Sequence, residues 1–509
     1  MRQSVYGKKV GKAMIRTGKP AGTKDSRPNI VLIMSDNQSA DFLGSYGNAE
    51  VKTPAIDQLA SQGSLFENTY CVNAMCSPCR ASVLTGLMPS AHGIHTWLDD
   101  GLADKWPERW NAIGEFDTLP DRLKASGYHT ALIGKYHLGS AWQPPHAFDH
   151  WVTFPHGHTI SFYDNQMIVN QDSFTHSGHS VDFFASQTVE FIQQQEAAEQ
   201  PFFCFVPFNG PYGHWPSIKG RAKTRFADLY DDSPLASVPR EGLNKRVLDR
   251  YIQRVLEAGA EPNERFAGPL LLPNETESIR NYFAQISLVD DAVGRIMAQL
   301  EASNLAENTI IIYTADHGFS LGNHGIWGHG LAAWPASMHR PSYHIPLVMR
   351  GPSLASGPRR QLVSQLDLAN TLLDACGAGL LDTPRQDSRV INLGDRQARH
   401  REAVFLEQEE SRAIRTETHL YIERFQHTRI TPLAPELYDL GADPEERSNI
   451  SESEQAAPIK ARLAAELASY FQHHADPARD LWAGGTAKSN LSNLRFWQQA
   501  WGSGWQCGF

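Results

Sequence analysis

Five short apolar runs, separated by longer stretches of helical periodicity, constrain the fold of this chain more than any other feature. Runs of this length and composition are typical of strands that are buried on both faces of a sheet. They are Ile30–Met34, Thr130–Ile133, Phe202–Val206, Thr309–Tyr313 and Ile345–Met349. Helical patterns lie between them, one opened by Thr53-Pro54 and another running from Ile279 to Leu300. We therefore predict an α/β sandwich in which these runs are parallel strands of a mainly parallel sheet.

Polar and ionisable residues follow four of the five runs. They are Asp36 and Asn37, then Lys135 and His137, then His214, and finally Asp316 and His317. Any one of them alone is an ordinary helix cap or turn residue. In open α/β sheets, however, ligands bind beyond the carboxyl ends of the strands. Four strands that deliver such groups to one edge predict a single functional site.

The pattern changes near residue 385. Ala403–Leu406, Arg412–Arg415 and Leu420–Ile422 are typical of short strands, and Leu463–Phe471 of a helix. We expect a polar N-terminal arm at residues 1–28, a catalytic domain at 29–385, and a small C-terminal α+β subdomain with an antiparallel sheet and a tail at 386–509. Residues 214–275 are rich in charge, Pro and Gly. They form either a lid over the substrate or a surface insertion.

Net charge and hydropathy exclude some classes of partner. The net charge of -10 argues against nucleic acid, which usually selects a basic surface. A small anion can still bind, because a local cluster of cations outweighs distant charge. We expect no membrane span, since no segment reaches roughly 18 apolar residues. The N-terminus has no apolar stretch typical of a secretory signal. We therefore expect a cytoplasmic location for the chain as written, and a periplasmic or secreted one if its N-terminus was trimmed.

Residues 76–80 form the most informative motif. Ser77 and Pro78 suit the N-cap and first position of a helix. Cys76 would then lie at the positive end of the helix dipole with Arg80 one turn further, an environment that stabilises an anion or a thiolate. Cys76 and Cys79 fit a redox pair, half a zinc site, or two buried structural cysteines.

A family resemblance adds another interpretation of this motif. Cys76-x-Pro78-x-Arg80, followed by Ala-Ser-Val-Leu-Thr-Gly86, resembles the signature of sulfatases, in which the cysteine is converted to formylglycine. Other blocks that resemble this family are Asn29–Asp36, Thr53–Ala60, Gly127–Gly139, Thr314–Gly318 and Leu437–Pro444. The resemblance implies the alkaline-phosphatase-like fold and hydrolysis of sulfuric esters. It also implies a maturation enzyme that generates formylglycine from Cys76.

The same resemblance implies a metal site. Its ligands are Asp36, Asn37, Asp316 and His317. Oxygen-rich ligation suits a hard cation, and the resemblance points to calcium, with magnesium as the alternative. Asn37 departs from the many members that have a second Asp at this position, which removes one negative charge.

The remaining roles are carried over residue by residue. Cys76, as hydrated formylglycine, attacks sulfur, while Arg80 holds the diol and Lys135 binds sulfate oxygens. His137 is the base that expels sulfate, and His214 is the leaving-group acid, with Tyr212 as the alternative in the same place. His329 falls where many members have a sulfate-binding lysine.

Aromatic and imidazole side chains near these residues favour a sulfated carbohydrate as the substrate. They are His156, His158, Phe162, Tyr163, Trp215, Trp327 and Trp334. The alternative is that the aromatics pack in the core, and a small aryl or alkyl sulfate is the next choice of substrate. Two other functions stay open: a phosphate or phosphonate monoester hydrolase of the same fold, and an inactive homologue that binds sulfate esters.

Overall fold

The computed structural model describes residues 26–98, 106–107, 109–145, 147–155, 157–158, 161–213, 219–220, 223–257 and 264–508. Every structural statement below concerns these residues. The predicted acid His214 lies outside them, as do His156 and Trp215.

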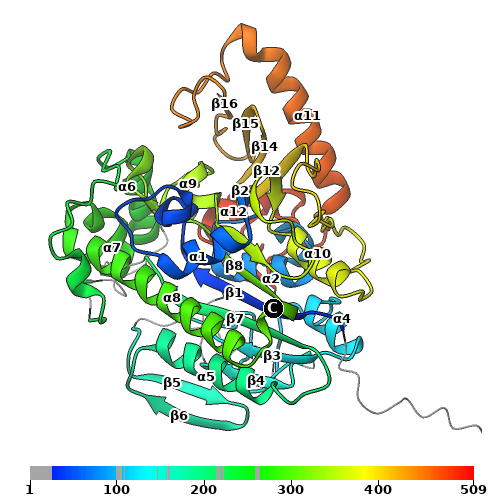
Figure 1. Ribbon diagram of the computed structural model, residues 1–509. Coiled ribbons are helices and arrows are strands. Elements are labelled where there is room, and N and C mark those ends of the chain that lie inside the picture. Colours follow the sequence, from blue (N-terminus) through cyan, green and yellow to red (C-terminus); the bar gives the residue numbers. More distant parts are fainter. Residues whose placement is uncertain are drawn as a thin grey trace, which may run out of the picture.

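A ten-stranded sheet forms the centre of the molecule, in the order β12-β2-β11-β8-β1-β7-β3-β4-β5-β6 (Figure 1). Its strands are β1 (Asn29–Asp36), β2 (Ser64–Tyr70), β3 (His129–Ile133), β4 (His150–Thr153), β5 (Asn165–Val169), β6 (Asp172–His176), β7 (Phe202–Pro211), β8 (Thr309–Ala315), β11 (Leu347–Arg350) and β12 (Gly357–Ser364). The central strands β8, β1, β7, β3 and β4 run parallel. In the register of the sheet, Leu32 lies between Phe205 and Ile312. The predicted mainly parallel sheet is therefore confirmed.

One predicted strand runs the other way. The run Ile345–Met349 contributes to β11, but β11 pairs antiparallel with both β8 and β2. A parallel neighbour needs a crossover that returns the chain to the amino ends of the strands. Between β8 and β11 the described chain forms only short elements, β9 (Ser320–Leu321), β10 (Trp327–Gly328), α9 (Arg340–Tyr343) and two single 3-10 turns. The connection therefore begins and ends at the carboxyl edge of the sheet.

Helices cover both faces of the sheet (Figure 1). α1 (Pro54–Gln62), α5 (Ser180–Gln194) and α8 (Thr276–Ala302) share a core with Val31 and Ile33. α2 (Cys76–Thr85), α4 (Leu119–Ala125) and α10 (Asp367–Ala375) share a second core with Ile30, Leu32 and Met34. Alternate residues of β1 thus enter opposite cores, which explains why the strand is an unbroken apolar run.

A four-stranded antiparallel sheet forms the smaller part of the molecule. Its strands are β13 (Ala403–Gln408), β14 (Ser411–Thr416), β15 (His419–Arg424) and β16 (Glu436–Asp439). α11 (Ala457–His474) packs on it through Leu463, Leu467 and Phe471. The remaining α-helices are α3 (Pro89–His92), α6 (Lys245–Ile252), α7 (Glu264–Leu271) and α12 (Leu494–Trp501). The predicted C-terminal strands and helix are therefore present.

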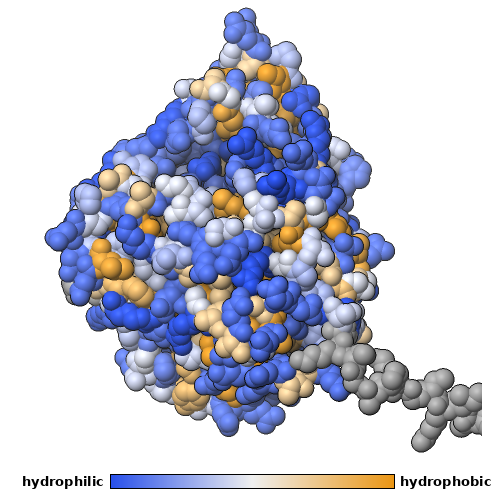
Figure 2. All heavy atoms as spheres, in the orientation of Figure 1, coloured by the Kyte–Doolittle hydropathy of each residue, from blue (hydrophilic) through white to orange (hydrophobic). Residues whose placement is uncertain are grey.

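Two observations bear on apolar zones, one on a single face of the surface and one on the described helices. On the face shown in Figure 2, apolar side chains lie in small groups among polar ones. In the part of the chain that the structure describes, no helix combines the length and apolar character needed to cross a bilayer.

Candidate active site

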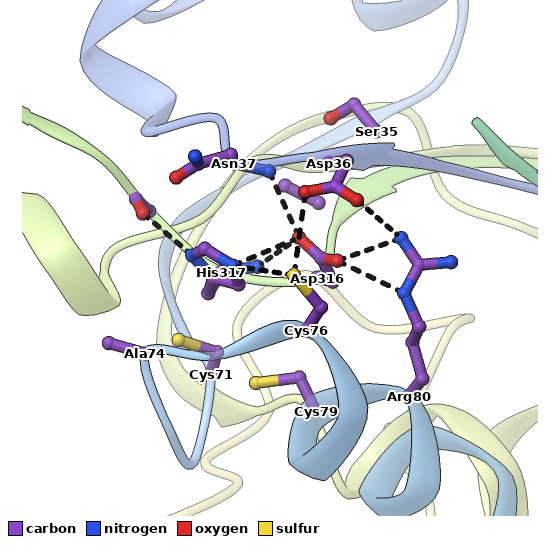
Figure 3. A network of polar contacts seen from close by, with 12 residues as sticks. Ser35, Asp36, Asn37, Cys71, Ala74, Cys76, Cys79, Arg80, Asp316 and His317 are labelled. Atoms are coloured by element: carbon purple, nitrogen blue, oxygen red, sulfur yellow. Dashed lines mark hydrogen bonds and ion pairs between the residues drawn. The ribbon is translucent and has the colours of Figure 1, made fainter. Parts of the chain in front are cut away.

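The carboxyl edge of the central strands brings most of the predicted residues together (Figure 3). Asp36 is the last residue of β1, Asp316 and His317 directly follow β8, and Lys135 follows β3. Asp36, Asn37, Asp316 and His317 are fully buried, and Arg80 and Lys135 nearly so. The parallel register of β1 and β8 places their carboxyl ends side by side, so residues about 280 positions apart in the chain meet at one site.

Cys76 is the first residue of α2, and the N-cap is Met75 rather than the predicted Ser77. Pro78 therefore lies deeper in the first turn, where its missing N–H needs no partner. The Ser77 hydroxyl accepts a hydrogen bond from the backbone N–H of Leu98 at 3.1 Å instead of capping the helix. Cys76 nevertheless lies at the amino end of the helix with Arg80 one turn further, as predicted.

The thiol of Cys76 faces the carboxylates and the imidazole of the site. Its Sγ lies 3.7 Å from Asp36 Oδ1 and 3.5 Å from His317 Nε2. Burial, together with the Asp36 carboxylate, raises the pKa of the Cys76 thiol well above its ordinary value. Burial therefore outweighs the stabilisation of a thiolate that the amino end of the helix was expected to give, and it favours the neutral thiol of Cys76.

Cys79 has a different environment. Its Sγ contacts the carbonyl oxygen of Asn73 at 2.7 Å, and the side chain is fully buried. Every cysteine that the structure describes is a free thiol. The arrangement gives no support to a Cys76–Cys79 redox pair, and the surroundings of Cys79 fit a structural residue.

Two buried cations neutralise the two buried carboxylates. Arg80 Nη2 lies 2.8 Å from Asp316 Oδ2 and 3.1 Å from Asp36 Oδ2, and Lys135 Nζ lies 2.6 Å from Asp36 Oδ2. Burial alone would lower the pKa of Arg80 and Lys135, but these carboxylates raise the pKa of both above its ordinary value. Both cations therefore stay charged. Because the four charges cancel, an added divalent cation would make the pocket attract anions.

The donor set at this edge fits a divalent cation. Ligand atoms of Asp36, Cys76, Asp316 and His317 all lie within 4.8 Å of one another. The Nδ1 of His317 faces the carbonyl oxygen of Gly318 at 2.9 Å. A carbonyl can only accept, so Nδ1 carries the proton and Nε2 presents its lone pair toward the site.

Asn37 supplies an independent observation that fits a metal ligand. Its backbone is fixed at φ 70, with its N–H donating to Asp316 Oδ1 at 3.0 Å and its carbonyl oxygen accepting from the Tyr282 hydroxyl at 2.7 Å. Its side-chain amide is buried, yet neither the oxygen nor the nitrogen has a hydrogen-bond partner among the described residues. A buried amide without a partner is costly, whereas an amide oxygen is a good ligand for a hard cation.

His137 is held as a neutral imidazole. Its Nε2 donates to the carbonyl oxygen of Leu98 at 2.9 Å, and its Nδ1 has no partner within the described chain. Burial, followed by the charge of Lys135, lowers the pKa of His137 well below its ordinary value. The residue therefore offers an unprotonated nitrogen beside Lys135, as a general base requires.

Of the other residues expected to contact the substrate, some lie at the site and one packs in the core. The ring of His329 lies perpendicular to that of His317 with centroids 5.9 Å apart. Lys135 Nζ lies 5.7 Å from the centroid of the Tyr212 ring, and the Tyr212 hydroxyl lies 3.3 Å from His158 Nε2. Trp327, in contrast, is buried and donates to the carbonyl oxygen of Gly242, so it packs in the core.

The C-terminal sheet supports the nucleophile loop through residues that the sequence did not point to. The backbone N–H of Glu407 donates to Val72 O at 2.7 Å, and Asn73 Nδ2 donates to Glu407 O at 2.7 Å. Gln408 Oε1 accepts from the Ala74 N–H at 3.2 Å. These partners lie more than 300 positions apart in the chain. The sequence pattern of β13 indicates only a strand, so it gave no signal for these contacts.

Comparison with known proteins shows the family to which the chain belongs. The family model for sulfatases matches residues 28–378, and the model for the C-terminal part of N-sulphoglucosamine sulphohydrolase matches residues 329–473. The N-acetylglucosamine-6-O-sulfatase of Bacteroides thetaiotaomicron is 27% identical, covering 85% of this chain and 84% of the relative. The choline-sulfatase of Rhizobium meliloti is 25% identical, covering 86% and 85%.

A solved structure of another protein has the same fold as this chain. It shows a protein in complex with its substrate D-glucosamine-2-N,6-O-disulfate, and it superposes with a TM-score of 0.67 at 25% identity, covering 88% of this chain and 98% of that one. The sulfatase model alone spans well over half of the sequence. The chain therefore belongs to the sulfatase family of the alkaline-phosphatase-like superfamily and is a sulfuric ester hydrolase with a metal site.

Proposed function

We propose that the nucleophile is formylglycine made from Cys76, that the metal is calcium, and that the substrate is a sulfated carbohydrate. The observation that carries the proposal is the meeting of Cys76 with Asp36, His317 and the unpartnered amide of Asn37 at one buried edge. In this arrangement Cys76 Sγ stands in for the oxygens of formylglycine. Hydrated formylglycine supplies two geminal hydroxyls, one to attack sulfur and one to restore the aldehyde as sulfate leaves.

Asp36, Asn37, Asp316 and His317 would hold the calcium ion, with magnesium as the alternative. When bound, the ion supplies positive charge to the sulfate oxygens and to the attacking hydroxyl. Asp316 stays ionised for this role, because nearby positive charge, that of Arg80 included, outweighs burial and lowers its pKa.

The remaining residues bind the sulfate and move protons. Arg80, anchored to Lys135 O at 2.7 Å and to Asp316, is fixed beside residue 76 and holds its diol. Lys135 and His329 bind sulfate oxygens. The free Nδ1 of His137 takes the proton that is released when the aldehyde is restored.

The leaving alcohol needs a proton donor, and substitutions can distinguish the two candidates for this role. His214 remains the predicted acid, and Tyr212, whose hydroxyl contacts His158, is the alternative. Loss of turnover in His214→Ala with activity retained in Tyr212→Phe would assign His214, and the reverse pattern would assign Tyr212. The substitution that removes the acid should slow the hydrolysis of a substrate with an activated aryl leaving group less than that of other substrates, because such a group needs little protonation.

Two relatives support a carbohydrate substrate. One is named for sulfate on N-acetylglucosamine, and the solved structure holds a disulfated glucosamine. We expect a panel of sulfated mono- and oligosaccharides, aryl sulfate, choline sulfate and aryl phosphate to give the fastest sulfate release with a sugar. Turnover of only the aryl or choline sulfate would overturn the carbohydrate assignment. Faster release of phosphate than of any sulfate would contradict sulfate as the preferred group.

A further inference from the structure

We infer that a groove between the C-terminal tail, defined as residues 475–508, and the segment that follows His329 binds a second sugar unit of a sulfated oligosaccharide. The inference rests on the carbohydrate substrate proposed above and adds a subsite to it. The groove has a volume of about 180 Å³. This is below the range of about 300–1,000 Å³ typical of pockets for drug-sized ligands, so it suits a single ring.

The segment that carries Trp334 to the groove also packs against the nucleophile loop. His329 is followed by Leu331 and Ala336, which pack against Met75, the residue before Cys76. Between them the chain carries Trp334 to the groove. Arg246 holds this turn by donating to Pro335 O at 2.6 Å and to Ala336 O at 2.8 Å. One short, anchored segment therefore joins the sulfate-binding position to Trp334.

The opposite wall belongs to this chain's own tail. Residues 475–508 lie beyond the ranges that the two family models match, 28–378 and 329–473. The tail is rigidly attached, because Glu409 accepts from the Ser492 N–H at 2.6 Å and from Trp497 Nε1 at 3.2 Å. Asn493 then caps α12 through the N–H of Phe496 at 3.1 Å. A groove built on these contacts is formed before any ligand arrives.

The side chains that line the groove suit a sugar. Trp334 is half-buried, and Phe496 packs edge-on against it with ring centroids 5.1 Å apart and planes at 74°. Indole faces stack on the C–H surface of sugars, while amides hydrogen-bond to hydroxyls. Gln253 supplies such an amide, and its buried Oε1 has no hydrogen-bond partner among the described residues. An apolar ligand would leave this oxygen unpaired.

Arg495 gives the groove a preference for a charged sugar. It lines the groove, is exposed, and forms no ion pair with any residue that the structure describes. Its guanidinium suits the two oxygens of a sulfate or carboxylate on the second sugar. The expected ligand is therefore an oligosaccharide with an anionic group on the unit next to the one that is cleaved.

The test compares D-glucosamine-2-N,6-O-disulfate with a tetrasaccharide that ends in the same unit. We expect Arg495→Glu to lower the ratio of kcat/KM, tetrasaccharide over monosaccharide, about tenfold, since it replaces an attractive charge by a repulsive one. Trp334→Ala should lower it similarly. Arg399→Glu is the matched control, because Arg399 is 92% exposed on a different surface, and its ratio should equal that of the unmodified enzyme.

Binding provides a readout without turnover. In a Cys76→Ala background, calorimetry should show weaker binding of the tetrasaccharide when Arg495→Glu is added. If the monosaccharide is hydrolysed but both groove variants leave the ratio and the Kd unchanged, the groove proposal is wrong and the proposed function stands. If no sugar sulfate is hydrolysed, the proposed substrate class fails. Calorimetry then decides the groove alone: a Kd weakened by Arg495→Glu supports it, and an equal Kd or no binding overturns it.

Discussion

Asn37 is the residue at which this chain departs from the two-aspartate pattern that many sulfatases have. Its side-chain amide is buried and has no partner among the described residues, while its backbone N–H donates to Asp316 Oδ1. We predict that Asn37→Asp tightens calcium binding about tenfold, because calcium affinity rises with the number of charged ligands. Asp316→Ala should abolish both binding and turnover. Calorimetry on metal-stripped protein measures the Kd, and an unchanged Kd in Asn37→Asp would place Asn37 outside the ligand set.

Cys79 tests whether the two cysteines of the motif have separate roles. Its thiol is buried against the Asn73 carbonyl oxygen and does not reach the carboxylates of the site. We predict that Cys79→Ala costs about 1–2 kcal/mol of unfolding free energy and leaves sulfate release per folded molecule intact. Urea unfolding and active-site-normalised rates check this. A loss of turnover comparable to that of Cys76→Ala would contradict a purely structural role.

At the scale of single residues, the sequence predicted which residues form the site better than it predicted their contacts. Asp36, Asp316 and His317 converge because parallel strands end at one edge, which the apolar runs already implied. The charge state of Cys76 was not predictable, because it depends on burial and on Asp36 in another element. Trp327 was expected near the substrate but packs in the core, since aromatic residues fit both environments.

Strand β13 contacts the loop that carries the nucleophile. Gln408 Oε1 accepts from the Ala74 N–H at 3.2 Å and from the Tyr343 hydroxyl at 3.1 Å. We predict that Gln408→Leu lowers kcat about tenfold with little change in KM, because residue 76 loses part of its support while Lys135 keeps its place. Gln397→Leu, at an exposed position outside β13, is the control. Equal kcat in both variants would show that β13 does not position the loop.

Two elements differ from expectation for physical reasons. α2 begins at Cys76 because a proline fits anywhere in the first turn, so Ser77 was free to bind Leu98 instead of capping. β11 runs antiparallel because no long crossover helix follows β8. An apolar run indicates a buried strand but carries no information about its direction.

At the scale of the whole molecule, a stacked pair of histidines contacts Glu446 of the C-terminal part. His324 stacks on His339 with centroids 4.0 Å apart, and His339 Nδ1 lies 3.1 Å from Glu446 Oε2. Burial, followed by repulsion from His339, lowers the pKa of His324 from 6.5 to about 4, despite the nearby carboxylates of Glu446 and Glu241. The neutral ring is therefore the form that the folded protein prefers.

A lowered histidine pKa makes stability depend on pH in a defined direction. The contribution of His324 is fully present above pH 6.5 and is lost as the pH falls toward 4, because the unfolded chain binds the proton more readily. We predict that His324→Asn, which suits the φ of 57 at this position, flattens this part of the curve of unfolding free energy against pH. Urea unfolding at several pH values tests it, and an unchanged slope would refute the role of His324.

The joining of the two sheets was the least predictable feature of the molecule. The sequence indicated a change of pattern near residue 385 and the strands that follow it. It gave no sign that the N–H of Glu407 would bond to Val72 or that His339 would meet Glu446, because such pairings depend on tertiary packing. Local periodicity reports which face of an element is buried, but not what covers it.

The most direct test of the proposed chemistry is a peptide mass spectrum across residue 76 of catalytically active protein. We expect the peptide to carry an aldehyde at residue 76 and an unmodified thiol at Cys79. We also expect the rate of sulfate release to rise in proportion to the converted fraction, and Cys76→Ala to be inactive. Full sulfatase activity in protein whose residue 76 is entirely an intact cysteine would contradict formylglycine as the nucleophile.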